Sequence, residues 1–412
     1  MAERKITAPK GTFDVLPEDG ERRRALALAA DNLLGRAGYG IVETPIFEHT
    51  ELFARGVGET TDIVQKEMFT FEDQGGRSLT LRPEGTAPTM RAYLEHGMHK
   101  LPQPVKLRYN GPFFRHEAPQ AGRFRQFSQI GVEAIGSDDP SLDAEVIALL
   151  HELIQGAGAK GVRLRIGSLG TPETRRDYSD ELRAYLRAHE DDLSEEVRSR
   201  IDANPLRAFD SDHRDTQRVM EGAPRLLERI APDDAEHFAE VRAMLDAAGV
   251  PYEVDATLVR GLDYYTRTVF EFTSDALGAQ SGVGGGGRYD LLAEQLGGPP
   301  TPGVGWAAGV ERILLAAGES PGTQPGVDVY IAYEGDADRT AMFRLQSELR
   351  GAGVRTQMEQ AGRSIKGQLK QANRLGAAKV IVVTPDEVRV RDMQSGDTQT
   401  VATPDDAKAL VS

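Results

Sequence analysis

The chain has 412 residues. A single hydrophobic core rarely supports a domain of that size, so we expect two or three domains. Its formal net charge of −15 argues against a protein that coats nucleic acid non-specifically, because such proteins are basic, and any RNA contact must be local. The absence of cysteine excludes disulfides, thiol redox chemistry and thiolate zinc sites.

The sequence contains no apolar run long enough to cross a membrane, and its first residues lack the apolar core of a secretory signal. We therefore expect a cytoplasmic protein without membrane contact. The histidines are scattered, and only His96 and His99 stand at helical spacing, so we expect no structural metal site.

The first predicted element is a helix that starts after Pro17 and ends at Gly38, where glycine can cap it. A strand is predicted next, over 41–47. Pro45 has no N–H to donate to a ladder, which favours an edge position or a bulge for this strand.

Short strands separated by turns are predicted over 66–135, with one helix over 86–97, and the hairpins imply mostly antiparallel pairing. A helix over 141–158 and a strand over 162–168 follow. Residues 172–242 then change character: they are rich in Arg, Asp, Glu and Ala at helical spacing, which predicts an inserted helical subdomain.

Strand-like segments resume after residue 243 and end in a helix before 318, so the core sheet is split in sequence. The Pro/Gly-rich stretch 319–327 is a predicted linker. Strands and helices alternate beyond it, which indicates a small α/β domain with largely parallel pairing.

The arginine-rich stretch 114–133 carries the strongest local signal. A predicted hairpin places Arg115 and Glu117 on one strand, Arg123 and Arg125 in the loop, and Phe127, Gln129 and Glu133 on one face of the returning strand. Arginines suit triphosphate oxygens because their planar fork binds two oxygens at once, and Phe127 could stack on a base. The alternative is an exposed hairpin whose arginines pair with acids across the strands.

Further arginines come from distant segments: Arg260 stands beside Asp263 and paired tyrosines, and Arg312 follows a glycine-lined turn. Together with the hairpin they suggest one polyanion site. The run SGVGGGGRYD formally contains GxGxxG, but it follows a hairpin late in a split sheet, so we do not predict a dinucleotide fold. The glycines indicate either close backbone approach or turn flexibility.

These residues resemble the class II aminoacyl-tRNA synthetases, and within them the histidyl-tRNA synthetase family, over nearly the whole chain. The resemblance rests on PKGTFDVLP near the start, LTLRPEGTAP, FRHE with GRFRQF, LVRGLDYY, GGGRYDLL, GVGWAAGVERIL and the late GRSIKGQLKQANRLGA. It implies an α+β catalytic domain with a six-stranded antiparallel sheet flanked by helices, a helical insertion and a C-terminal α/β anticodon-binding domain. The predicted domains are a catalytic domain over 1–171 and 243–318, the insertion 172–242, the linker 319–327 and the anticodon-binding domain 328–412.

The resemblance implies that ATP with Mg²⁺ and L-histidine form histidyl-adenylate, and that tRNA-His then accepts the histidyl group on a homodimeric enzyme. Arg115 and Arg260 are the expected catalytic residues, because they would hold the α-phosphate. The expected ATP-binding residues are Arg115, Glu117, Arg123, Phe127 and Arg312.

The expected histidine-binding residues are Glu84, Thr86, Arg115, Gln129, Glu133, Arg260, Tyr264 and Tyr265. Glu133 and Tyr265 would bond the imidazole, which would exclude apolar analogues because polar groups would be left unpaired. The expected tRNA-binding residues are Gln120, Arg125, Arg363, Lys366, Lys370 and Arg374, the last four in an acid-free stretch that could also be a solvated helix face. The family often carries histidine at the position of Ser128, which leaves the role of this residue open.

An alternative function is that of a non-catalytic relative, the histidine-binding regulatory subunit of ATP phosphoribosyltransferase. Such relatives typically lack the terminal domain and the full arginine set. The chain retains Arg115, Arg260, Arg312 and the terminal segment, which favours the enzyme.

Overall fold

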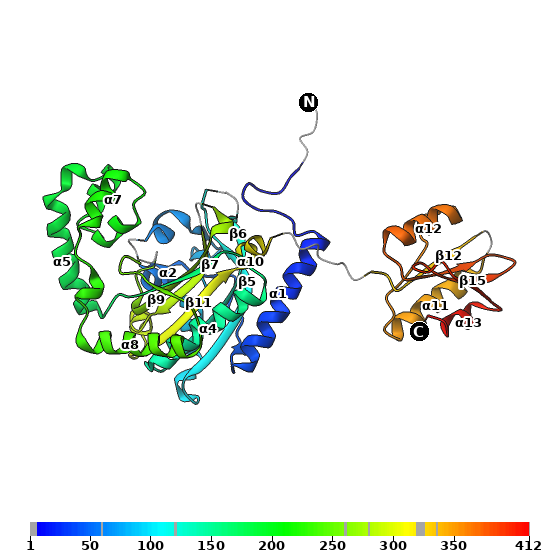
Figure 1. Cartoon of the computed structure of the whole chain (residues 1–412), viewed down its shortest axis with the longest axis horizontal. Coiled ribbons are helices and arrows are strands. Elements are labelled where there is room, and N and C mark those ends of the chain that lie inside the picture. Colours follow the sequence, from blue (N-terminus) through cyan, green and yellow to red (C-terminus); the bar gives the residue numbers. More distant parts are fainter. Residues whose placement is uncertain are drawn as a thin grey trace, which may run out of the picture. The chain divides into compact units, whose positions relative to one another are not determined.

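The structure is a computed structural model that describes residues 6–58, 61–118, 122–258, 262–278, 281–318, 326–334 and 337–411. The chain divides into two compact units, residues 1–320 and 321–412, and each unit is described by itself (Figure 1). Within the described ranges, no helix combines the length and the apolar character needed to cross a bilayer.

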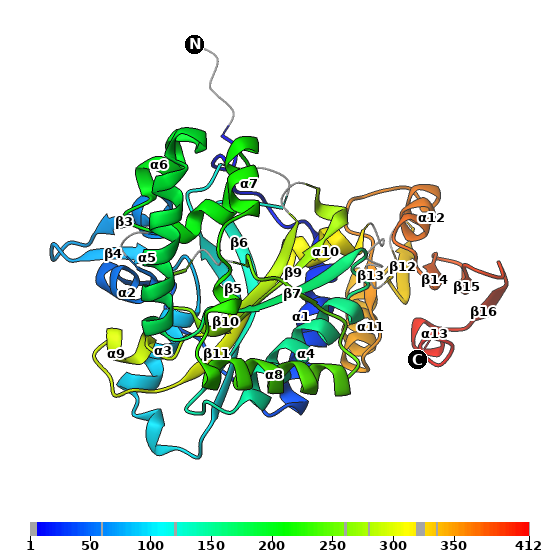
Figure 2. The same cartoon turned by 60° about the vertical axis from the view of Figure 1, so that its left-hand side comes forward.

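A large sheet forms the centre of the first unit (Figure 2). Its eight described strands run in the order β1-β5-β6-β11-β10-β9-β7-β8. In this spatial order, the six strands β5, β6, β11, β10, β9 and β7 pair antiparallel with their neighbours. The short edge strands β1 and β8 pair parallel with β5 and β7. The expected six-stranded antiparallel sheet is therefore present, with one short strand added at each side. The bounds are β1 Gly40–Ile41, β5 Val105–Phe114, β6 Gln126–Ile135, β7 Val162–Ser168, β8 Glu253–Val254, β9 Thr266–Ser274, β10 Gly282–Arg288 and β11 Gly303–Gly309.

A small second sheet has the order β2-β4-β3, with β2 Phe47–His49, β3 Phe69–Glu72 and β4 Ser78–Leu81. The single strand predicted over 41–47 is wrong: Ile41 ends β1 in the large sheet, Phe47 begins β2 in the small one, and the residues between are not in a strand. Pro45 lies in this break, where its missing N–H costs no ladder bond.

One face of the large sheet is covered by α1 Pro17–Arg36, α4 Pro140–Gly156, α8 Pro232–Ala247 and α10 Val310–Ala317. Leucine and alanine side chains of these helices pack against alternate residues of β6, β9 and β11. The side chain of Asp139 accepts a hydrogen bond from Ser141 N and so caps α4. Alternation leaves Gln129 and Glu133 of β6 on the opposite face, as the strand pattern predicted.

The opposite face is bordered by shorter elements: α2 Thr50–Val57, the π-helix Ile63–Glu67, α3 Thr86–Glu95 and α9 Leu292–Gln295. The stretch predicted as an insertion is helical, with α5 Pro172–Ala188, α6 Glu195–Arg200 and α7 Arg214–Glu221. Residue 242 lies inside α8, and α8 contributes Phe238, Val241 and Leu245 to the core of the large sheet.

The second unit has a sheet of order β13-β12-β14-β15-β16 (Figure 1). Its bounds are β12 Val329–Tyr333, β13 Thr356–Met358, β14 Lys379–Val383, β15 Val388–Asp392 and β16 Thr398–Val401, with helices α11 Arg339–Gly351, α12 Ile365–Arg374 and α13 Pro404–Lys408. The first three strands pair parallel, but β14, β15 and β16 pair antiparallel, so the prediction of largely parallel pairing is right only for half of this sheet.

Candidate active site

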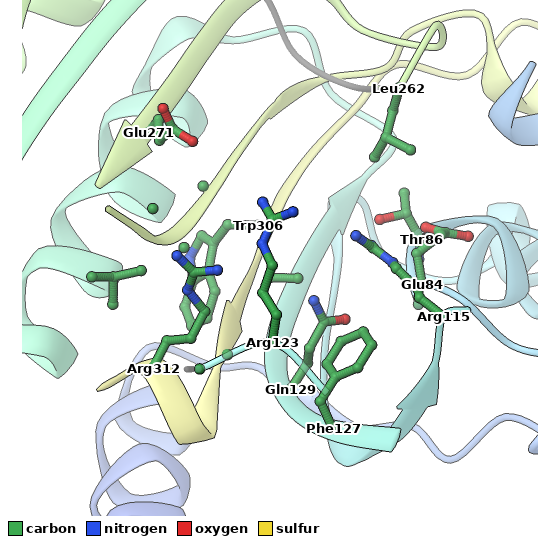
Figure 3. Close-up of a pocket in the computed structure, with 18 of the residues that line it drawn as sticks. Glu84, Thr86, Arg115, Arg123, Phe127, Gln129, Leu262, Glu271, Trp306 and Arg312 are labelled. Carbon is green, nitrogen blue, oxygen red and sulfur yellow. Dashed lines mark hydrogen bonds between the residues drawn. The ribbon is translucent and has the colours of Figure 1, made fainter. Parts of the chain in front are cut away.

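A polar cavity of about 370 Å³ opens on the sheet face that the helix layer leaves free. Its walls come from β6, β9, β10 and β11, from the start of α3, from the hairpin segments that flank β5 and β6, and from α10. Figure 3 shows Arg123 in the middle of this cavity, Arg312 on one side, and Arg115 with Glu84 and Thr86 on the other. Residues separated by more than two hundred positions thus share one site.

The hairpin arginines surround one carboxylate. Arg123 donates to Glu117 Oε2 at 2.9 Å, and Arg115 lies 3.8 Å from Glu117 Oε1. Arg115 also donates through Nε to Pro83 O at 2.9 Å, and its guanidinium lies 5.5 Å from the ring centre of Phe127. Both Arg115 and Glu117 follow the end of β5 at Phe114, so they lie beyond the strand in which they were predicted. These contacts hold the Arg115 fork at the edge of the cavity.

Arg312 enters the cavity from the first turn of α10. Burial lowers the pKa of its guanidinium, and the nearby charge of Arg123 lowers it further. Like charges held close together repel each other, so a bound anion would relieve this repulsion. The site is therefore suited to a polyphosphate.

Glu84 closes the other end of the cavity at the start of α3. Its carboxylate accepts hydrogen bonds from the backbone N–H groups of Thr86 at 2.7 Å and Ala87 at 3.0 Å. Burial raises the pKa of Glu84, while these bonds and the charge of Arg115 oppose the rise. A buried carboxylate beside a hydroxyl is suited to an ammonium group.

Glu133 lies under this end of the cavity and is fully buried. It accepts hydrogen bonds from the hydroxyls of Thr86 at 2.8 Å, Tyr109 at 3.2 Å and Tyr289 at 2.5 Å. Burial raises the pKa of Glu133 to about 8, although the hydroxyl donors oppose the rise. Thr86 therefore connects the cavity to a buried carboxyl group whose pKa is raised.

Two aromatic residues that precede β9 complete this end of the site. Tyr264 and Tyr265 both line the cavity and pack edge to face, with ring centres 4.7 Å apart. Burial raises the pKa of Tyr264 well above its ordinary value, so it remains a neutral hydroxyl. Gln129, which lines the cavity, has its Oε1 buried without a hydrogen-bond partner among the described residues, and this leaves an acceptor for a ligand.

The glycine run occupies β10, between β9 and β11. A Cβ added at Gly284 would lie 2.7 Å from Ala308 Cβ, and one at Gly287 would lie 2.5 Å from Thr268 O. Close backbone approach is therefore the correct interpretation of these glycines, and they make room for the cavity above them. Across the part of the chain that the structure describes, no group of three or more histidine, aspartate or glutamate side chains is arranged to hold a metal ion.

The structure brings together most of the predicted site residues. Of the exceptions, Arg260 and Gln120 lie outside the described residues, and Glu133 is fully buried beneath the cavity rather than in its wall. Arg125 lies beside the cavity, where its Nε donates to Glu117 O at 3.4 Å. Sequence reasoning missed Glu271, Tyr109 and Tyr289, although strand alternation along β9 could have placed Glu271 on the cavity face.

The predicted basic residues of the second unit lie on and before α12. Lys366, Lys370 and Arg374 follow one another at four-residue spacing and are exposed, so they share one face of the helix. Arg363 instead pairs with the buried carboxylate of Glu359, at 3.2 Å. The predicted basic surface therefore has three exposed charges and one anchored residue.

The antiparallel sheet, the arginine-lined cavity on one of its faces and the separate C-terminal α/β unit define a class II aminoacyl-tRNA synthetase. Comparisons with known proteins narrow this class. The family model described as histidyl-tRNA synthetase matches residues 11–313, and the model described as anticodon binding domain matches residues 328–411. The chain belongs to the histidyl-tRNA synthetase family.

Similar proteins carry the corresponding name. The chain is 48% identical to the histidine–tRNA ligase of Desulforamulus reducens over 96% of both chains, and 46% identical to that of Rhodococcus opacus over 97% of this chain and 96% of the relative. The crystal structure of apo histidyl-tRNA synthetase from S. aureus is 37% identical, with a TM-score of 0.82, and covers 99% of this chain and 100% of the other.

Proposed function

We propose that the chain is a histidine–tRNA ligase. It activates histidine with ATP to histidyl-adenylate and pyrophosphate, and then transfers the histidyl group to the 3′ end of tRNA-His. The observation that carries this proposal is the single cavity that joins a polyphosphate end, with Arg115, Arg123 and Arg312, to an ammonium end, with Glu84 and Thr86. The full-length similarity to histidine–tRNA ligases supports the same function.

ATP enters as its Mg²⁺ complex, with the triphosphate along the arginines. In the proposed arrangement Arg115 binds the α-phosphate, Arg123 the triphosphate and Arg312 the γ-phosphate. Glu117 bonds the adenine, and Phe127 stacks on it. For this Arg123, whose side chain is 38% exposed, must exchange its bond to Glu117 for phosphate oxygens, to which its planar fork can donate two hydrogen bonds.

Histidine binds at the other end of the cavity. Glu84, Thr86 and Gln129 receive its α-ammonium group, and Arg115 and Arg260 bind its carboxylate. Glu133 and Tyr265 bond the imidazole. Because Glu133 is fully buried and accepts from three hydroxyls, it must exchange one of these donors for a ring N–H. The hydrogen bond between Thr86 and Glu133 supports this arrangement, because both ends of the amino acid then meet one connected polar network.

The first step is an in-line displacement. A carboxylate oxygen of histidine attacks the α-phosphorus, and the bond to the bridging oxygen of pyrophosphate breaks. Arg115 and Arg260 stabilise the negative charge that grows on the α-phosphate oxygens. In the second step a ribose hydroxyl of the terminal adenosine attacks the activated carbonyl, loses its proton, and AMP leaves.

The assembly and location follow from the same proposal. We infer a homodimer built partly through the small sheet, because the apolar residues Ile46, Phe47 and Phe71, on and beside β2 and β3, are 42–51% exposed. The C-terminal unit would bind the tRNA anticodon, with Lys366, Lys370 and Arg374 as phosphate contacts. Gln120 and Arg125 would contact the acceptor end of tRNA-His, and the enzyme would work in the cytoplasm.

The regulatory subunit of ATP phosphoribosyltransferase is not favoured. One solved structure from Bacillus halodurans, described as such a subunit or a histidyl-tRNA synthetase, has a TM-score of 0.67 but only 23% identity, so it supports the fold alone. The match of residues 328–411 to an anticodon binding domain gives this chain a module that a purely histidine-binding subunit does not need.

The test is histidine-dependent exchange of labelled pyrophosphate into ATP, followed by charging of tRNA-His. We expect both activities, and we expect the exchange to need histidine among the twenty amino acids. Well-folded protein that binds histidine without exchange would support the regulatory subunit instead.

A further inference from the structure

The segment that precedes α1 reaches back to the arginine-bearing hairpin loop. The backbone N–H of Arg125 donates to Gly11 O at 2.7 Å. The ring of Phe13 packs on Phe124, with centres 4.4 Å apart, and Phe124 lines the cavity directly beside Arg123. The loop of the hairpin is therefore held by residues more than a hundred positions away in sequence.

Arg23, in the first turns of α1, contacts both Phe13 and a buried polar cluster formed by Glu311 and Ser128. The Arg23 guanidinium lies 5.4 Å from the ring centre of Phe13, donates to Glu311 Oε1 at 2.8 Å and donates to Ser128 Oγ at 3.2 Å. Glu311 also accepts from Ser128 N, at 3.0 and 3.1 Å through its two oxygens. Its side chain is 8% exposed and that of Arg23 is 19% exposed, so solvent screens this pair only weakly.

The same helix contacts the other end of α10. Arg22 donates to Leu314 O at 3.2 Å and to Gly318 O at 2.6 Å. A guanidinium on the last carbonyl groups of a helix satisfies acceptors that have no partner within the helix and opposes its dipole. Adjacent arginines of α1 thus hold α10 at both of its ends.

The contacts of Phe13 and Arg23 end on residues that adjoin proposed ATP-binding residues in the sequence. Glu311 precedes Arg312, Ser128 follows Phe127, and Phe124 follows Arg123. We propose that residues 9–23 are a positioning element for ATP: Phe13 and Arg23, acting through Phe124, Ser128 and Glu311, hold the two arginines and the adenine-stacking ring in one arrangement. This inference rests on the proposed function of the cavity.

The physical reason is the sensitivity of phosphoryl transfer to position. A displacement of about 1 Å in a group that orients the substrate can lower a rate about 100-fold. The hairpin loop and α10 are far apart in the sequence, so their relative position depends on tertiary contacts. The Glu311 carboxylate bridges them because it accepts from Arg23 and from the backbone of Ser128 at once. This also assigns Ser128 a role: its N–H and hydroxyl are the β6 side of the bridge.

The experiment measures pyrophosphate exchange by the full chain as a function of ATP and, separately, of histidine. We expect Arg23→Met and Phe13→Ala each to raise the KM for ATP about 10-fold or more and to lower kcat, while the KM for histidine changes less than about 2-fold. Arg23→Lys should restore part of the loss, because it keeps the charge but not the fork.

The control is Lys106→Met. Lys106 donates to both oxygens of Glu145 at 2.8 Å, and its side chain is 22% exposed, close to the 19% of Arg23, but this pair joins β5 to α4 away from the cavity. Its kinetic constants should match those of the wild type. Thermal unfolding is followed for every variant. If Arg23→Met does not fold, Ser128→Ala, which removes only the hydroxyl that accepts from Arg23, takes its place in the kinetic test.

Two results would overturn the inference: equal changes in both KM values, or unchanged ATP kinetics in folded Arg23→Met or Ser128→Ala. A wild-type chain without exchange would instead contradict the proposed function, so the two failures are distinguishable.

Discussion

Gly305 of β11 lies directly against Glu133 of β6, so that a Cβ added to the glycine would overlap Oε2 of the carboxyl group and lie 2.8 Å from its Cδ. The carbonyl oxygen of Val132 blocks the same space. The strand must carry glycine here because the buried carboxyl and the neighbouring backbone both occupy the volume of a side chain. Packing at the floor of the site therefore depends on this pair.

We predict that Gly305→Ala destabilises the first unit by about 3 kcal/mol or more, at the upper end of overpacking effects, since backbone atoms cannot move aside easily. Gly351→Ala is the matched control: no atom lies within 4 Å of the added Cβ at the end of α11, so stability should rise by at most about 1 kcal/mol. Denaturant unfolding measures both. Wild-type stability of Gly305→Ala would contradict the close contact between this glycine and Glu133.

Arg115→Ala should lower kcat for pyrophosphate exchange about 100- to 1000-fold, because a preorganised donor to the α-phosphate is lost from a site sheltered from water. Arg115→Lys should recover little of this loss, since a lysine cannot bind two oxygens with a planar fork. Arg77→Ala is the control, because Arg77 pairs with Asp73 on an exposed turn. Exchange within about 2-fold of wild type would show that Arg115 does not act on the phosphate.

The raised pKa of Glu133 predicts how stability changes with pH. Between the ordinary pKa of 4.5 and the folded value of about 8, the folded carboxyl binds more protons than the unfolded one. The free energy of unfolding contributed by this group therefore falls as pH rises through that window, and is constant below and above it. Glu133→Gln cannot ionise, so the stability of this variant relative to wild type should improve as pH rises from about 4.5 to about 8.

Urea unfolding of both proteins across this range measures the effect. Glu359→Gln is a control of opposite sign in the second unit: burial would raise the pKa of Glu359, but hydrogen bonds from Tyr330, Ala361 and Arg363 outweigh it and lower the pKa. In the wild type, the carboxylate of Glu359 should therefore stabilise the folded state at pH values above its unfolded pKa. This stabilisation should be lost as the pH falls through the folded pKa of Glu359. A relative stability of Glu133→Gln that does not vary with pH would mean that Glu133 is ionised in the folded chain.

Replacing Lys366, Lys370 and Arg374 together by alanine should raise the KM for tRNA-His and weaken the dependence of tRNA affinity on salt, because fewer counterions are released. Histidine-dependent exchange should remain unchanged, since it needs no tRNA. Arg355→Ala is the control in the same unit, as Arg355 is paired with Asp328 through the N–H groups of its side chain. An unchanged salt dependence would exclude this helix face from tRNA binding.

Much of the fold and of the site could be predicted from local patterns. Strand alternation placed Gln129 and Glu133 on one face, and the acid-free stretch in the last domain predicted the exposed charges of α12. The strand over 41–47 was wrong because the residues around Pro45 leave one sheet before they join another, and local propensity carries no information about which sheet a strand joins.

The sequence by itself determined the residue types of the site, their spacing and the family to which they belong. Only the tertiary structure decided that Arg23 meets Glu311 and that Glu133 meets Thr86, Tyr109 and Tyr289. Alternation and helical spacing are properties of neighbouring residues and are visible in one dimension. Burial, the pKa that follows from it, and contacts between distant segments depend on how the layers pack, because desolvation and hydrogen bonding are set by every group that surrounds a side chain.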